Sequence, residues 1–151
     1  MSAARDPIII EAARTADEPA VRALLQSAGL PHEDFAGHLA NFLVARQDGA
    51  VVGAVGFERH GDEALLRSLV VAPGWQGDGL GGALLRRLEN EAKRQGVRDF
   101  YLLTTTAEHF FAKRWFQKID RTSVPPAIAA TSEFSHLCPA SSICMRRTVK
   151  P

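Results

Sequence analysis

The sequence predicts a single α+β domain in which helices flank a twisted, mixed and mostly antiparallel sheet. Three observations favour this class. Asp48-Gly49 separates two apolar runs, the helical pattern that begins near Leu80 lies between two strands, and the apolar periods follow the order β-α-β-β-β-α-β-α-β. A chain of 151 residues supports one core, whereas two domains would each have a marginal one. We therefore expect residues 1–151 to form one domain.

The N-terminal part of the chain is predicted to be a strand followed by a helix. Residues 7–12 form an apolar, β-branched run, and Asp17 is suited to cap a helix that Gly29 ends. The buried face of this helix is predicted to hold Val21, Leu24, Leu25 and Ala28. Residues 31–37 have no sustained period, which favours a loop or a short helix.

The middle of the chain is predicted to be an antiparallel meander. Residues 42–46 and 50–57 are apolar runs on either side of the Asp-Gly turn, which is a strong hairpin signal. A second turn at residues 60–62 leads into the apolar run 64–71.

The C-terminal half returns to helical spacing. The apolar face of its first helix is predicted to hold Leu80, Ala83, Leu84, Leu88 and Ala92. The polar face is predicted to hold Arg86, Arg87, Glu89 and Lys93. Gly96 ends this helix, and residues 100–104 form the next strand, so the unit is expected to be a right-handed parallel crossover. Residues 107–116 are predicted to be an amphipathic helix, and residues 143–149 a last strand.

Charge and composition argue against several classes of function. With 18 basic and 17 acidic residues, the chain has no bulk charge to attract nucleic acid or a membrane surface. No apolar run approaches the roughly 18 residues of a membrane span, and the first residues lack the core of a signal peptide, which favours a cytoplasmic protein. Cys138 and Cys144 are expected to be reduced, partly buried thiols; a soft-metal or arsenic-binding pair is the weaker alternative, and no metal is expected.

The segment 71–82 combines a strand end, a turn and several glycines that run into a helix. Glycine allows the backbone to approach a ligand, and the first amides of a helix are unpaired donors in a positive dipole field. The segment therefore predicts a cradle for phosphate groups.

Two nucleotide motifs fit this segment poorly. A Walker loop requires Lys-Ser/Thr directly after its last glycine, whereas Ala83 follows the last glycine here. The dinucleotide pattern G-x-G-x-x-G is formally satisfied by Gly77, Gly79 and Gly82, but it requires an acidic residue at the end of the next strand, and Asp99 stands at the start.

A third pattern agrees with the whole segment. Gln76–Gly81, with Val71-x-Pro73 before it, resembles the acyl-CoA pyrophosphate loop of the GNAT N-acetyltransferase superfamily, Q/R-x-x-G-x-G/A. The resemblance implies that acetyl-CoA is the cosubstrate and that backbone groups hold it. The loop would bind the pyrophosphate of acetyl-CoA, and the preceding strand would bind its pantetheine arm. The implied cofactor-binding residues are Leu69, Val70, Val71, Gln76, Gly77, Asp78, Gly79, Leu80, Gly81, Gly82, Thr105 and Phe111. The alternative is a glycine turn that only separates a strand from a helix.

The C-terminal half has narrower resemblances. Residues 103–105 and 110–116 resemble the corresponding segments of bacterial glutamate N-acetyltransferases, and residues 121–147 resemble GNAT proteins associated with arsenic resistance. These resemblances imply acetyl transfer to the amine of a small amino acid or analogue, such as glutamate, phosphinothricin or arsinothricin. A homodimer is a further expectation. The alternatives are a GNAT enzyme acting on a peptide or protein amine, a noncatalytic acyl-CoA sensor and, most distant, a nucleotide-binding regulatory module.

The chemistry of acetyl transfer suggests roles for particular residues. Direct attack by the amine in a ternary complex needs no protein nucleophile, and an N–H near Val70 or Val71 can polarise the thioester. Many GNAT enzymes place a tyrosine acid in the helix after the fifth strand; the resemblance puts Phe111 there, and Trp115 where a glycine is usual. On this resemblance, thiolate release is expected to proceed with water or without an acid.

Three further side chains are candidates for contact with the substrate. Glu63 is a candidate water-linked base, or a solvated carboxylate in a turn. Arg67 interrupts an apolar strand and either binds a substrate carboxylate or is paired within the structure. His109 lies where it could face the substrate, although a lone histidine is more often structural.

Overall fold

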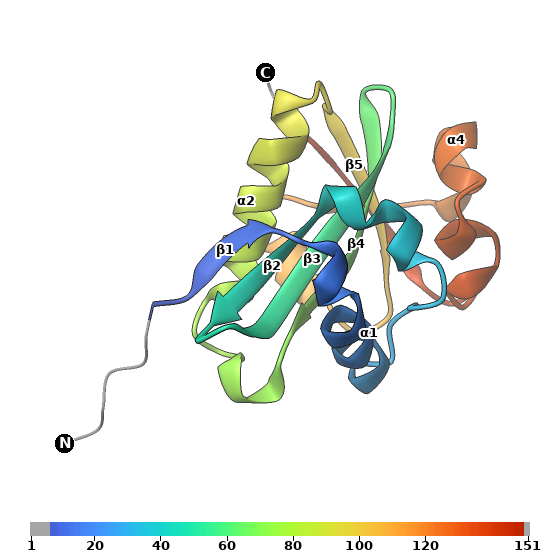
Figure 1. Cartoon of the computed structure of the whole chain (residues 1–151). Helices are drawn as coiled ribbons and strands as arrows, with labels where there is room; N and C mark the ends of the chain where they lie inside the picture. Colours follow the sequence, from blue (N-terminus) through green and yellow to red (C-terminus); the bar gives the residue numbers. More distant parts are fainter. Residues whose placement is uncertain (1–6, 150–151) are drawn as a thin grey trace. The chain divides into compact units, whose positions relative to one another are not determined.

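The computed structural model describes residues 7–149 and confirms the α+β class (Figure 1). In this part of the chain seven strands form a sheet in the order β1-β2-β3-β4-β5-β7-β6. The strands are β1 (Ile9–Ala12), β2 (Phe42–Gln47), β3 (Ala50–His60), β4 (Glu63–Val71), β5 (Asp99–Thr104), β6 (Gln117–Ile119) and β7 (Ile143–Thr148). The α-helices are α1 (Glu18–Ser27), α2 (Leu80–Arg94), α3 (Glu108–Ala112) and α4 (Pro126–Ala129).

Residue contacts group these elements into two compact units. The first comprises residues 7–56 and Ser68–Glu89, and the second comprises Phe57–Arg67 and residues 90–149. The strands β3 and β4 and the helix α2 contribute residues to both units. Each unit has its own cluster of buried apolar side chains.

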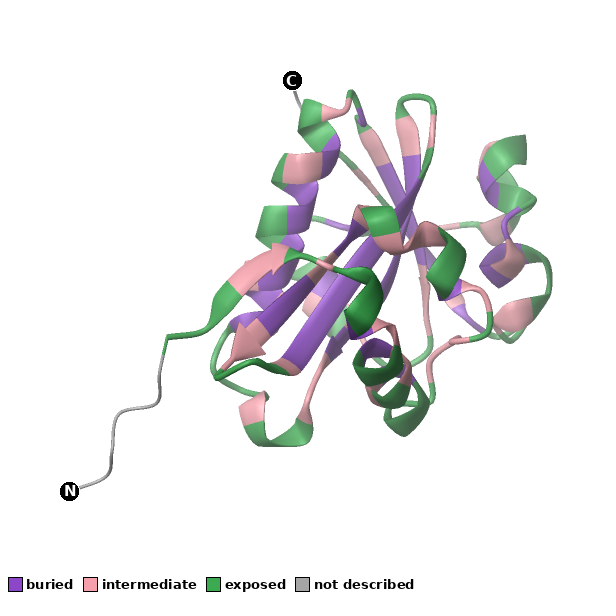
Figure 2. Ribbon diagram, viewed as in Figure 1, coloured by how far each residue is buried: buried purple, intermediate pink, exposed green. Residues whose placement is uncertain are grey.

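The core of the first unit lies between α1, the 3₁₀ helix η2 (Phe35–Asn41) and β2–β4. Its buried residues are Val21, Leu25, Phe35, Phe42, Val44, Ala54 and Val70. Burial follows β2 and β3 closely, while the outer side of α1 is exposed (Figure 2). Val21 and Leu25 confirm the predicted helix face and Leu24 packs partly against it, but the prediction for Ala28 was wrong: it follows the last turn of α1 and is exposed.

The predicted hairpin between β2 and β3 is confirmed. Gln47 pairs with Ala50 across the turn, and Asp48 and Gly49 have φ of 51° and 80°. Two successive positive φ values are the geometry that Asp-Gly favours in a two-residue hairpin. The strands stay close: a Cβ on Gly56 would lie 2.2 Å from the Phe42 ring, so that position requires glycine.

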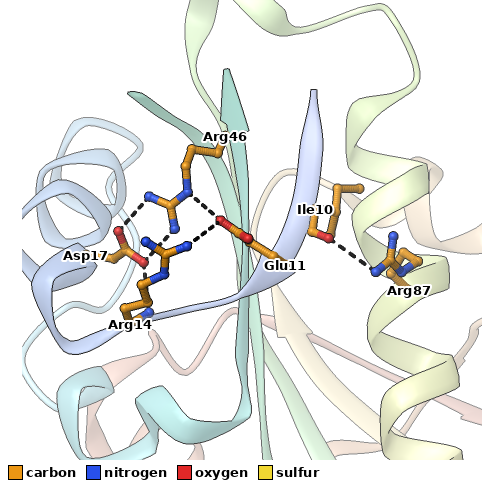
Figure 3. A network of polar contacts seen from close by, with 6 residues as sticks. All are labelled: Ile10, Glu11, Arg14, Asp17, Arg46 and Arg87. Carbon is orange, nitrogen blue, oxygen red and sulfur yellow. Dashed lines mark hydrogen bonds and ion pairs between the residues drawn. The ribbon is translucent and has the colours of Figure 1, made fainter. Parts of the chain in front are cut away.

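Asp17 stands at the N-cap position of α1, as predicted, but its carboxylate makes no capping hydrogen bond there and binds an arginine instead (Figure 3). Arg46 donates to both carboxylate oxygens of Asp17 at 2.8 and 2.9 Å, and to Glu11 at 2.7 Å. The backbone N–H of Arg14 donates to Asp17 at 2.8 Å. These contacts hold the pKa of Asp17 below its usual value, with the Arg46 hydrogen bonds as the main cause. They also join β1, β2 and the segment before α1.

The second unit confirms the parallel strand pairing of the predicted crossover. Glu63 and Ala64 of β4 pair in parallel register with Asp99 and Phe100 of β5. β7 then pairs antiparallel with β5, and β6 pairs with the other edge of β7. The prediction for Glu89 in α2 was wrong, because this residue is buried rather than on the polar face.

Some elements of this unit differ from the prediction or were absent from it. α3 spans only Glu108–Ala112 rather than 107–116, and Trp115 follows with a φ of 74° that no α-helix can continue through. Neither β6, α4 nor the π-helical turn η5 (Glu133–Leu137) was predicted. The last two contribute Ile128 and Phe134 to a core with Leu65, Tyr101 and Cys144.

Both cysteines are free thiols, with Cys144 buried and Cys138 partly buried, as predicted. Burial raises the pKa of Cys138 to about 12 and that of Cys144 to about 11, so both thiols stay protonated near neutral pH. Within residues 7–149, no helix combines the length and the apolar character needed to cross a bilayer.

Candidate functional site

The turn between β4 and α2 has the geometry that its sequence suggested. After β4 ends at Val71, Pro73–Trp75 form one 3₁₀ turn, and Gln76–Gly79 are exposed before α2 begins at Leu80. Gly77 and Gly79 have φ of 89° and 84°, a region that other residues rarely adopt. Glycine is therefore required here by the path of the backbone.

The first turn of α2 offers amide groups that the helix itself does not use. Its first i→i−4 hydrogen bond runs from the N–H of Ala83 to the carbonyl of Gly79, at 3.1 Å. The preceding N–H groups, those of Leu80, Gly81 and Gly82, have no carbonyl four residues back within the helix. Apart from the chain neighbours, no heavy atom of residues 7–149 lies within 4 Å of a Cβ built on Gly77 or Gly79. The turn thus has open space at its two positive-φ glycines, directly before the first amides of α2, although Leu80 and Gly82 are themselves buried.

The end of β4 is fixed on one side by the core and on the other by Gln76. The side chain of Val70 is buried, whereas Leu69 and Val71 are only partly buried. The Gln76 amide donates a 3.0 Å hydrogen bond to the carbonyl of Val71. Gln76 therefore shapes the turn through its side chain and ties the loop to the strand that precedes it.

A hollow of about 330 Å³ lies beside the same turn. Most of its lining is apolar and comes from the segment around β1, the end of β2, the turn after β4 and the start of α2, namely Ile8, Ile10, Gln47, Trp75, Asp78, Gly79, Leu80 and Ala83. Arg87, further along α2, donates to the Ile10 carbonyl at 3.2 Å, which directs this cation to β1 (Figure 3).

The strand, turn and helix just described lie inside a region that matches a known family. Residues 38–118, more than half of the chain, match the acetyltransferase (GNAT) domain family. The chain belongs to this family. The assignment confirms the family resemblance on which the loop prediction rests.

Curated relatives of this GNAT chain are amino-acid acetyltransferases. The enzyme of Ralstonia nicotianae is 38% identical over 80 residues, which are 52% of this chain and 18% of that protein. The enzyme of Pseudomonas syringae pv. tomato is 29% identical over 98 residues, 64% of this chain and 23% of that protein. The chain therefore spans less than a quarter of the length of these relatives.

Solved structures show the same fold. The N-acetylglutamate synthase of Neisseria gonorrhoeae, complexed with coenzyme A and N-acetyl-glutamate, superposes with a TM-score of 0.83 at 23% identity, covering 99% of this chain and 37% of that chain. A Mycobacterium tuberculosis protein in complex with CoA and NLQ gives a TM-score of 0.80 at 23% identity, covering 94% of this chain and 99% of that chain.

The predicted cofactor and substrate residues around α3 differ in exposure. Phe111 is buried, with its ring 5.1 Å from Phe110 and 5.4 Å from Phe116, both edge-on. Thr105 and His109 are exposed. Phe111 thus packs within an aromatic cluster of the second unit, and a role of all three residues toward a ligand stays a prediction.

Glu63 is the first residue of β4, whereas Leu69–Val71 lie at the other end of that strand. Burial raises the pKa of Glu63 above its usual value, and the nearby charges of Asp62 and Asp99 raise it further. A raised carboxyl pKa is typical of general bases but also of crowded carboxylates. The role of Glu63 as a base therefore stays a prediction.

Arg67 is completely buried and already has carboxylate partners. Its Nη1 donates to Glu58 at 2.7 Å, and its Nε lies 3.3 Å from Glu133. This arrangement favours the second interpretation of Arg67, a structurally paired arginine, over binding of a substrate carboxylate. The sequence analysis missed both glutamates, because Glu58 follows the apolar run 50–57 at the polar end of β3 and Glu133 lies in a segment for which no element was predicted.

Proposed function

We propose that this chain is an acetyl-CoA-dependent N-acetyltransferase that acts on the amine of a small amino acid or amino-acid analogue. The observation that carries the proposal is the turn Gln76–Gly82, whose positive-φ glycines and first helix amides, which precede the first i→i−4 bond of α2, suit a pyrophosphate. Membership of the acetyltransferase (GNAT) domain family supports the cosubstrate. The 38% identity to an amino-acid acetyltransferase supports the class of acceptor.

The loop explains how a nearly neutral chain could hold a polyanion. The formal net charge is only +1, so bulk attraction is weak. Backbone amides supply directed donors at no cost in net charge, and the dipole of α2 adds a favourable field at the same place. Leu69 and Val71, at the end of β4, would align the pantetheine arm beside the strand.

The reaction itself needs positioning more than protein chemistry. The neutral amine attacks the thioester carbonyl carbon, a C–N bond forms and the C–S bond breaks. The attacking nitrogen gives up one proton to water, and the thiolate takes up one proton. Holding both reactants in one ternary complex supplies most of the rate, and a main-chain N–H at the end of β4 would stabilise the oxyanion. Because the family resemblance puts Phe111 where many GNAT enzymes have tyrosine, we assign the proton for the thiolate to water.

A thiol-release assay with acetyl-CoA tests the proposal directly. The panel holds free amino acids and analogues, including glutamate, phosphinothricin and arsinothricin, and a matched set of peptides with free N-termini or lysines. Turnover confined to free amino acids is the expected result. Turnover confined to peptides would favour the alternative of a protein-modifying enzyme, and binding of acetyl-CoA without turnover on any amine would favour a noncatalytic sensor.

A further inference from the structure

The second unit contains a buried ion-pair cluster formed by Glu58, Arg67 and Glu133. Arg67 has no exposed side-chain surface, and the two carboxylates are each only 5% exposed. They come from β3 and from the first residue of η5, so one guanidinium of β4 is held between two separate segments. Breaking a buried pair on one side leaves a charge without compensation, which makes such a cluster resist displacement.

Glu133 is itself firmly placed. Arg121 donates hydrogen bonds of 2.8 Å to the carbonyls of Phe134, inside the η5 turn, and Pro139, just after it. The N–H of Cys138 donates to the Glu133 carbonyl at 3.0 Å, and the Phe134 ring belongs to the core of the unit. The carboxylate of Glu133 is therefore a fixed anchor for Arg67 rather than a mobile side chain.

Arg67 immediately precedes a backbone conformation that needs support. Ser68 is buried and has a φ of 62°, in the left-handed region. This conformation costs a non-glycine residue about 1 kcal/mol and persists only where its surroundings impose it. The next residues along the chain are Leu69–Val71, the end of β4 at which the acetyl group is proposed to bind. A change in the path of the chain at Ser68 would therefore reorient their N–H groups.

We propose that Glu58 and Glu133 are positioning residues for acetyl transfer: by holding Arg67 they fix the left-handed turn at Ser68 and so orient the N–H groups of Leu69–Val71. The catalytic part of this inference rests on the proposed function. The cluster thus acts through the backbone, and Arg67 serves as its centre instead of binding substrate.

The first test compares Glu133→Gln with a matched control, Asp17→Asn. Each variant neutralises one buried carboxylate of an arginine pair, but Asp17 belongs to the first unit and pairs with Arg46 of β2 rather than with Arg67 of β4. In thiol release with the best amino acid of the panel, Glu133→Gln should lower kcat about 10-fold, because small misplacement of reacting groups is costly. KM for acetyl-CoA should change less than about twofold, since ground-state binding is retained. Asp17→Asn should leave both values near those of the wild type.

Two further readouts separate positioning from general damage. Hydrogen exchange of a peptide covering residues 66–72 should become about tenfold faster in Glu133→Gln, while residues 80–94 keep their protection. This pattern would show that the chain opens locally and not globally. Adding Ser68→Gly to Glu133→Gln should restore part of the lost kcat, because glycine adopts the left-handed conformation without support.

The proposal would be overturned if Glu133→Gln resembled Asp17→Asn in kcat and in hydrogen exchange, or if hydrogen exchange in Glu133→Gln rose equally in residues 66–72 and 80–94. It would also be overturned if adding Ser68→Gly restored none of the lost kcat. A wild-type protein without turnover on any amine would contradict the proposed function instead. In that case the exchange comparison alone decides the positioning claim.

Discussion

Asp17 and Arg46 form a two-point ion pair, with one guanidinium nitrogen on each carboxylate oxygen at 2.8 and 2.9 Å. The pair joins the segment before α1 to β2, and Arg46 reaches Glu11 of β1 with its third nitrogen. Charge, geometry and partial burial coincide here, so the contact should matter for stability more than the exposed ion pairs of this chain do.

Replacing Asp17 by Asn should lower the free energy of unfolding by about 2 kcal/mol near neutral pH, because Arg46 loses a charged partner. The pKa of Asp17 is lowered in the folded protein, so its contribution is present above the unfolded-state pKa and is lost as the pH falls through the folded value. The difference between the two proteins should therefore shrink below about pH 4. Urea denaturation at a series of pH values measures this, and a difference that persists undiminished in acid would contradict it.

Replacing Trp115 by Gly should stabilise the protein. Trp115 has a φ of 74° and is 78% exposed, so it bears the cost of a left-handed conformation and loses little burial when truncated. The expected gain is about 1 kcal/mol in the free energy of unfolding. The matched control is Lys113→Gly, two residues earlier at a φ of −66°, where glycine should destabilise. Equal effects of the two substitutions would show that the backbone conformation at Trp115 is not the cause.

Replacing Glu63 by Gln tests a carboxylate whose pKa is raised by burial and by Asp62 and Asp99. A raised pKa means that ionised Glu63 disfavours the folded state, so the variant should have a higher Tm than the wild type at pH 7. The two should converge below the unfolded-state pKa of about 4.3, where the carboxyl is protonated in both states. If Glu63 is also the base, Glu63→Gln should release thiol more slowly than the wild type at pH values above the pKa of Glu63. The acidic limb of the wild-type pH–rate profile should be absent from the variant, and an unchanged profile would exclude that role.

The features predicted well are those that depend on neighbouring residues. The Asp48-Gly49 hairpin, the crossover that starts at Leu80 and the turn of Gln76–Gly82 each have a local cause, a backbone conformation or an apolar period. Such causes are visible in a single sequence.

The features that were missed depend on segments that are distant in the sequence. Nothing local in η5 indicates that Glu133 reaches Arg67, and the cap expected of Asp17 gave way to a partner on β2. The three-residue strand β6 is short and mostly polar, so it has no apolar period to detect. Tertiary pairing decides all three cases, and propensity does not report it.

The most direct test of the central claim is a calorimetric titration of CoA into the wild type, Gly79→Ala and Gly74→Ala. Both glycines lie between β4 and α2 with free space around them, but only Gly79 has a positive φ. We predict that Gly79→Ala weakens CoA binding about tenfold or more, because a strained backbone turns the loop amides away from the pyrophosphate, while Gly74→Ala binds like the wild type. Absence of CoA binding by the wild type, or equal affinity of all three proteins, would contradict the assignment of Gln76–Gly82 as the pyrophosphate cradle.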